Sequence, residues 1–183
     1  MTTATGLLTA EDFAALPTEG LRLELIRGEI QTMAPAFGDH GKVAMTLSGY
    51  VTHYVQSKKL GSVYAAETGF LIARNPDTVR APDFAFIQAS RVTPATEAAF
   101  WIPVIPDLVV EVVSSGDRPK AVAEKVNMWL DVGVQLVWVV YPAQREVSAH
   151  RPGQPEQRLS VGDMLDGSDV ISGFTLPVAE IFA

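Results

Sequence analysis

Two carboxylates interrupt segments that otherwise have the composition of buried strands. Asp83 lies in the run 79–87, and Glu111 lies in the run 107–113. Continuous apolar runs of this length, bounded by turn residues, indicate strands that are covered on both faces. An ionised carboxylate in such a strand is unstable unless it is paired, hydrogen-bonded or bound to a metal. A buried ion pair explains one such residue, but two on successive strands favour a metal site.

Lys125 is the third residue of this candidate site. It lies in a predicted helix from Arg118 or Pro119 to about Val132, on the apolar stripe of that helix. Lysine is rarely fully buried, and the alternative is that its stem packs while its ammonium group reaches water. Strand periodicity lets Asp83 and Glu111 point to one place if their strands are neighbours, and two carboxylates there require a nearby cation.

Metal-assisted phosphodiester hydrolysis is the chemistry that requires this set of side chains. Carboxylate oxygens bind hard divalent cations, which polarise a phosphoryl oxygen and lower the pKa of a bound water. A lysine ammonium group orients that water or stabilises the developing negative charge. The chain contains no cysteine and no histidine cluster, so the set favours Mg²⁺ or Mn²⁺ over zinc.

The elements that position these residues follow a simple order. Thr9 caps a short helix, and residues 21–26 and 29–33 form a hairpin; residues 35–41 are a loop. The remaining expected elements are a helix at 43–59, strands at 62–73, 79–88 and 107–113, a long connection at 89–106 with a helical turn at 96–101, the helix of Lys125, a strand at 135–141, a hairpin at 145–151 and 157–161, and a short last helix. The pattern predicts one α/β domain over residues 1–183, with a mixed central sheet and an α-β-β-β-α-β core.

Composition limits the classes of function. The chain has 183 residues, of which 48% are hydrophobic, so it is long enough for one well-buried domain and short for two. The net charge of −7 argues against a broad nucleic-acid surface. It does not exclude an enzyme, because a bound divalent cation presents positive charge to phosphate. The N-terminus lacks a basic signal-peptide region, and no apolar run is long enough for a membrane helix. We therefore expect a cytoplasmic protein without a membrane partner.

Pro82-Asp83, Glu111 and Lys125, with the expected order of elements, resemble the PD-(D/E)XK nuclease superfamily. From about Thr9 to the C-terminus the chain more closely resembles the Uma2 family of restriction-endonuclease-like proteins. The segments that carry this resemblance are 23–30, 33–35 with His40, 68–70, 80–83, 106–112, and 133–134 with Trp138. Each of these motifs is short, but their order and spacing together are specific.

The resemblance implies a metal-dependent endonuclease that acts on DNA rather than RNA, with a homodimer as a further expectation. Asp83 and Glu111 would bind Mg²⁺ or Mn²⁺, and Lys125 would orient water or stabilise charge. Glu24 would be an accessory catalytic acid, and His40 would contact the substrate. The alternatives are an exposed strand acid for Glu24 and a residue just before a helix for His40.

The chain departs from the superfamily at one position of the motif. The lysine that usually follows the glutamate by two residues is replaced by Val113, so in the Uma2-like pattern Lys125 supplies the ammonium group. Acidic residues common in the family near Leu136 and Tyr141 are also absent, and we expect altered packing there rather than lost catalysis.

Two other functions fit the same sequence. A non-catalytic nucleic-acid or protein-binding module on this fold would explain the acidic charge and the lack of a basic stripe. A metal-dependent hydrolase of a small phosphate or nucleotide would also reduce the conflict with that charge. The intact Asp-Glu-Lys set favours the nuclease over the binding module.

Overall fold

A computed structural model of the chain describes residues 6–17, 20–33 and 38–183. Expectations for residues 1–5 and 34–37 lie outside the described residues. The elements in chain order are α1 (Ala10–Ala14), β1 (Arg22–Ile26), β2 (Glu29–Met33), α2 (Gly38–Lys58), β3 (Gly61–Ala65), β4 (Phe70–Ala73), β5 (Thr78–Arg80), β6 (Phe84–Gln88), the short 3-10 helix η1 (Ala89–Arg91), α3 (Pro94–Ala98), β7 (Leu108–Val112), α4 (Pro119–Asp131), β8 (Leu136–Tyr141), β9 (Glu146–His150), β10 (Gln157–Leu159), β11 (Met164–Asp166), β12 (Thr175–Pro177) and α5 (Val178–Ile181).

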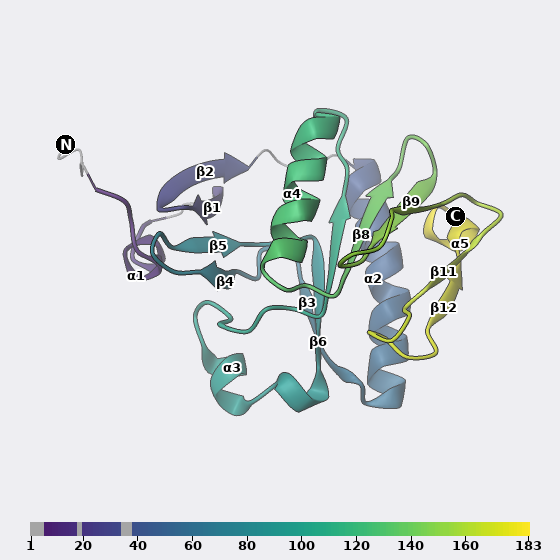
Figure 1. Cartoon of the computed structure of the whole chain (residues 1–183), viewed down its shortest axis with the longest axis horizontal. Helices are drawn as coiled ribbons and strands as arrows, with labels where there is room; N and C mark the ends of the chain where they lie inside the picture. The colour runs from purple at the N-terminus through teal and green to yellow at the C-terminus, as the bar shows by residue number, and fades with distance from the viewer. Residues whose placement is uncertain (1–5, 18–19, 34–37) are drawn as a thin grey trace.

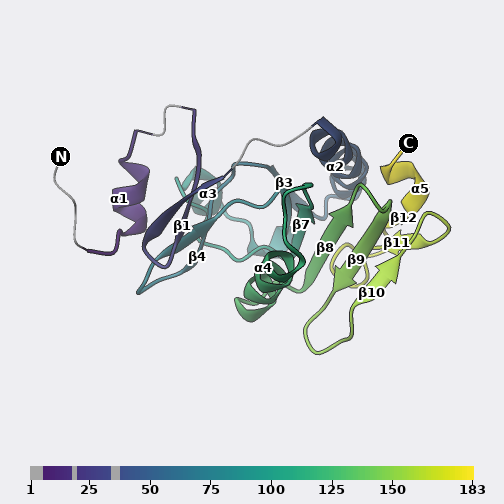
Figure 2. The same cartoon turned by 90° about the horizontal axis from the view of Figure 1, so that it is seen from above.

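The central sheet has six strands in the order β10-β9-β8-β7-β6-β3. Strands β7 and β8 run parallel, and the other neighbours are antiparallel. Helices α2 and α4 cover opposite faces of this sheet, as Figure 2 shows. The predicted α/β class with a mixed central sheet is confirmed. Along the chain, α2-β3-β6-β7-α4-β8 follows the expected α-β-β-β-α-β order.

Each side of the central sheet has its own apolar core. On one side, α2 contributes a stripe at helical spacing, Val43, Leu47, Val51 and Val55, which packs with strand residues such as Trp138. On the other side, Val126 and Trp129 of α4 pack with residues that include Ala85, Val109 and Val137. Alternate residues of β6 and β7 therefore face opposite helices, because successive side chains of a strand point to opposite faces.

The two long strands expected at 62–73 and 79–88 are each divided, so those predictions are wrong. A turn in which Glu67 has a φ of 72° separates β3 from β4. Pro82, which lacks an N–H to donate to a ladder, lies in the break between β5 and β6. Strands β4 and β5 do not belong to the central sheet. They pair with the N-terminal hairpin in a second sheet, β2-β1-β5-β4 (Figure 1).

Boundaries differ from the sequence predictions in three further places. Helix α2 begins at Gly38, so the second half of the loop expected at 35–41 is helical. Helix α3 spans Pro94–Ala98, so it begins two residues before the expected turn at 96–101 and ends three residues earlier. Strands β11 and β12 form a small hairpin that the sequence did not indicate, whereas the β9–β10 hairpin agrees with its prediction. None of the helices in the described part of the chain is long and apolar enough to cross a membrane.

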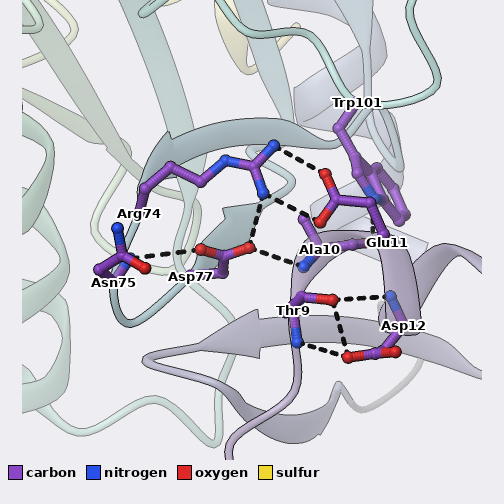
Figure 3. Close-up of polar contacts among 8 residues, drawn as sticks. All are labelled: Thr9, Ala10, Glu11, Asp12, Arg74, Asn75, Asp77 and Trp101. Carbon is purple, nitrogen blue, oxygen red and sulfur yellow. Dashed lines mark hydrogen bonds and ion pairs between the residues drawn. The ribbon is translucent and has the colours of Figure 1, made fainter.

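Helix α1 is tied to the second sheet by a polar cluster (Figure 3). Thr9 forms the expected capping box, in which its hydroxyl accepts from Asp12 N at 3.1 Å and its own N–H donates to the Asp12 carboxylate at 3.0 Å. The buried Asp77 carboxylate accepts from Ala10 N and from Arg74, both at 2.8 Å. Arg74 also pairs with Glu11 at 2.9 Å. The β4–β5 turn thus holds the first turn of α1.

Replacing Asp77 tests this connection. We expect Asp77→Ala to lower the free energy of unfolding by about 1–3 kcal/mol, because it leaves the buried Ala10 N–H without its acceptor. Asp169→Ala is the matched control, since Asp169 is exposed and a surface change of this kind alters stability by at most about 0.5 kcal/mol. Urea unfolding of the three proteins measures both values. Equal stability of the two variants would contradict the prediction.

Candidate active site

Asp83 lies directly before β6, where the chain passes from the second sheet into the central one. Its Oδ2 accepts from Val112 N at 2.8 Å and lies 3.2 Å from His40 Nε2. Because Phe84 pairs with Val110 in the antiparallel β6–β7 ladder, continuing the register places Asp83 opposite Glu111. The expectation that Asp83 lies inside a continuous strand is wrong, but its carboxylate still faces the end of β7.

Glu111 lies within β7 and is 7% exposed. Its Oε2 is 2.7 Å from Lys125 Nζ, and its Oε1 accepts from Trp129 Nε1 at 2.8 Å. Both donors come from α4 and are four residues apart, so they lie on one face of that helix. Trp129 was not a candidate from the sequence, because a tryptophan on the apolar stripe of a helix resembles any core residue; its four-residue spacing from Lys125 shows only that the two share a face.

Lys125 carries its charge into the site instead of away from it. Its side chain is 24% exposed, so the stem is largely covered by the apolar contacts of α4. The ammonium group bonds the carboxylate of Glu111, whereas a snorkelling lysine would direct its charge to water. The structure therefore favours the ion-pair interpretation of Lys125 over the snorkelling one.

Glu24 is buried on β1, with 2% exposure, so the alternative of an exposed strand acid is wrong. Its Oε1 accepts from Ala81 N at 2.9 Å, and its Oε2 is 3.1 Å from Arg80 Nη1. Leu25 pairs with Val79 in the antiparallel β1–β5 ladder, and continuing this register places Glu24 opposite Arg80. Sequence reasoning assigned no role to Arg80, because the pairing of β1 with β5 cannot be seen in local patterns.

The sequence placed His40 just before a helix, and this is wrong: His40 belongs to the first turn of α2. Its Nε2 faces Asp83, and both side chains are 11% exposed. The histidine thus connects the N-terminal end of α2 to the break between β5 and β6.

Asp83 and Glu111 each have a cationic partner that affects their titration. Burial would raise the pKa of Asp83, but hydrogen bonds from His40 and from Val112 N outweigh it and lower that pKa. The same hydrogen bond raises the pKa of His40 above its usual value. Burial raises the pKa of Glu111, and the nearby Asp83 adds to this effect. Burial opposes the charge of Lys125, but Glu111 and Glu24 raise its pKa, so the ammonium group stays protonated.

The five residues singled out in the sequence line one cleft with a volume of about 1300 Å³. The structure brings together Glu24, His40, Asp83, Glu111 and Lys125 from β1, α2, the β5–β6 break, β7 and α4. Arg80 lines the same cleft. The arrangement places three carboxylates and an ammonium group beside a space large enough for a substrate, while the catalytic roles of these residues stay predictions.

The donor set fits a hard divalent cation with few protein ligands. Within residues 6–17, 20–33 and 38–183 there is no group of three or more His, Asp or Glu side chains arranged to hold a metal. Mg²⁺ commonly uses one or two carboxylates and completes its shell with water and substrate phosphate oxygens. Asp83 and Glu111 meet this requirement, whereas a structural zinc site needs four protein ligands.

The His40–Asp83 pair makes a prediction about pH. Because the pKa of His40 is raised from 6.5, its contribution to stability is fully present below pH 6.5 and is lost as pH rises through the raised value. In buffer with a chelator, we expect His40→Gln to be less stable than wild type at low pH, with a difference that shrinks toward high pH. Chemical unfolding from roughly pH 5 to 9 measures this.

His53→Gln is the control for this prediction. His53 lies on the exposed face of the same helix, so its replacement should alter stability little at any pH in the series. A His40→Gln difference that stays constant over the series would contradict the role of the ion pair.

Comparisons with known proteins agree with this fold and identify the family. The family model of Uma2, described as "Putative restriction endonuclease", matches residues 10–179. A crystal structure from Anabaena variabilis ATCC 29413, titled a putative nuclease belonging to DUF820, has a TM-score of 0.83 and 20% identity, and covers 96% of this chain and 97% of that one. At this identity the likeness shows a shared fold. No curated protein matches. The family match spans nearly the whole chain and confirms the resemblance found in the sequence: the protein belongs to the Uma2 family.

Proposed function

We propose that this protein is a nuclease that depends on Mg²⁺ or Mn²⁺ and hydrolyses phosphodiester bonds, with DNA as its substrate. The observation that carries the proposal is the meeting of Asp83, Glu111 and Lys125 in one cleft, from three separate elements. Family membership supports nuclease activity, and the structure adds the residues that would perform it.

Asp83 and Glu111 would hold the divalent cation, which supplies Lewis-acid polarisation of the phosphate and a more acidic bound water. Lys125 is held by Glu111 at 2.7 Å, so its ammonium group has a defined place beside that carboxylate. From there it orients the attacking water or stabilises negative charge on the phosphate oxygens. Lys125 on α4 thereby takes the role of the superfamily's motif lysine, whose position is occupied by Val113 in this chain.

Glu24 acts in this proposal mainly by holding the backbone. Its carboxylate binds Ala81 N, two residues before Asp83, and its pairing with Arg80 fixes the end of β5. Glu24 thus holds the backbone that leads to Asp83, and Val112 N fixes the Asp83 carboxylate itself by donating to its Oδ2. Catalysis benefits from such preorganisation, because misplaced ligands reduce the rate steeply. His40 also pairs with Asp83, and because it lines the cleft it would contact a substrate bound there.

A non-catalytic binding module is the second candidate. The structure offers one observation in its favour: both oxygens of Glu111 already accept hydrogen bonds, from Lys125 and from Trp129. A carboxylate satisfied in this way is stable without a metal. The hydrolase of a small phosphate is less well supported, because the cleft of about 1300 Å³ exceeds the ~300–1,000 Å³ of most small-molecule sites.

Cleavage assays with matched variants separate the two candidates. We expect wild-type protein to nick supercoiled plasmid DNA in Mn²⁺, and Asp83→Asn to lose this activity because the neutral amide binds a divalent cation far more weakly than the carboxylate does. Lys125→Gln should lower the rate on the order of 100-fold or more while metal binding, followed by calorimetry, persists. We choose glutamine because its amide can still donate to Glu111. A shorter side chain would leave the buried Glu111 carboxylate without the partner that Lys125 provides.

Lys120→Gln is the control for Lys125, because Lys120 lies on the same helix and its side chain is 88% exposed. It should cleave like wild type. Cleavage by Asp83→Asn at the wild-type rate would show that the activity comes from a contaminant, and the binding module would then be the better candidate.

A further inference from the structure

An exposed aromatic ring forms part of the wall of the active-site cleft. Phe100 is 72% exposed, and it lines the cleft together with Trp101, Asp83 and Glu111. Isolated exposed apolar side chains are common on protein surfaces and need no explanation. This ring differs because it lies within the cleft that contains the two carboxylates.

Phe100 is presented by a rigid support. The Trp101 ring stacks on Phe13, with centroids 5.0 Å apart and an interplanar angle of 11°, and its indole N–H donates to Ala10 O at 2.9 Å. The Phe100 ring packs edge-to-face on Trp101, with centroids 4.6 Å apart at 88°. A ring held in this way loses little further freedom when it binds a ligand.

Gly69 makes this support possible. A Cβ on Gly69 would lie 2.4 Å from the Trp101 ring, so only glycine permits the close approach. The backbone beside the tryptophan is also held, because Ile102 N donates to Gly69 O and Leu71 N donates to Ile102 O, both at 2.9 Å. The segment that carries Phe100 is thereby attached to the start of β4.

The charges of the cleft do not suit a ligand that binds through phosphate groups alone. Each Arg or Lys side chain named along the described cleft wall has a carboxylate partner: Arg22 with Glu67 at 3.5 Å, Arg80 with Glu24 at 3.1 Å and Lys125 with Glu111 at 2.7 Å. Duplex DNA exposes phosphates and grooves and keeps its base faces stacked inside the helix. Unpaired bases offer free faces, which stack on aromatic side chains whatever their sequence.

From these observations we infer that the cleft binds single-stranded nucleic acid, with an unpaired base stacked on Phe100 beside the carboxylate site. This inference rests on the proposed nuclease function and names its substrate class. The volume of about 1300 Å³ favours a strand over a free nucleotide, because single small ligands usually occupy ~300–1,000 Å³.

Equilibrium binding in the presence of a chelator tests the inference without cleavage. The probes are a short DNA strand containing 2-aminopurine, the same strand in a blunt duplex, the strand with an abasic site in place of 2-aminopurine, and the mononucleotide dAMP. We expect the wild type to bind the single strand more tightly than the other three. Phe100→Ala should raise the Kd for the strand by about 5- to 150-fold, and Phe100→Trp should retain binding and fluorescence quenching.

Met45→Ala is the matched control. Met45 is also 72% exposed, but it lies on α2 outside the cleft, so its replacement should leave the Kd unchanged. The inference is overturned if Phe100→Ala binds the strand as Met45→Ala does, or if the duplex binds more tightly than the strand. Binding of dAMP as tight as that of the strand, with the same dependence on Phe100, would assign the ring to a free-nucleotide site and would also overturn it.

The plasmid assay separates this inference from the proposed function. If cleavage of duplex DNA requires Asp83 but not Phe100, the proposed nuclease function is supported and the inferred single-strand preference is wrong. If the strand binds in a way that depends on Phe100 but no cleavage occurs, the stacking site is supported and the proposed nuclease function is wrong.

Discussion

The burial of Glu111 is the constraint on which the site depends. Strand β7 lies inside a six-stranded sheet with helices on both faces, so a carboxylate there loses its hydration. Lys125 and Trp129 compensate this loss, and they can do so only if one face of α4 packs against β7. One buried charge thus determines how the helix is oriented and where the ammonium group of the site lies.

The second carboxylate owes its position to the division of the chain between two sheets. Strand β5 belongs to the four-stranded sheet and β6 to the central one, and Asp83 lies where the chain passes between them. The Glu24–Arg80 pair holds the end of β5, and Val112 N holds Asp83 against β7. The four-stranded sheet is therefore part of the site, because it supplies one wall of the cleft and fixes the approach to Asp83.

The charged side chains of the site are paired with opposite charges, so their net electrostatic potential is small. Glu111 is matched by Lys125, and Asp83 is matched by His40. Neither pair carries a net positive charge, so attraction of a nucleic acid would depend mainly on the divalent cation and on aromatic contacts, while Lys125 would act on the phosphate once it is bound. Phe100 and Trp101 line the same cleft, where Trp101 stacks on the buried Phe13 and holds the Phe100 ring edge-to-face, so the inferred base contact would lie there. This balance would reconcile a net charge of −7 with the phosphodiester substrate that we propose.

Local patterns in the sequence determined the elements and the main candidates for the site. The apolar runs of β7 and β8, the stripe of α4 and the Thr9 capping box are set by neighbours in the chain, and lone charges such as Glu111 and Lys125 are visible against them. Tertiary structure decided the rest. The runs at 62–73 and 79–88 divide because their two halves pair in different sheets. Strand β3 pairs with β6 and β4 with β5, whereas β5 also pairs with β1 and β6 with β7, and local patterns do not show these partners. Glu24 is buried because Arg80 comes to it across that pairing, and no local pattern records a partner so distant in the chain.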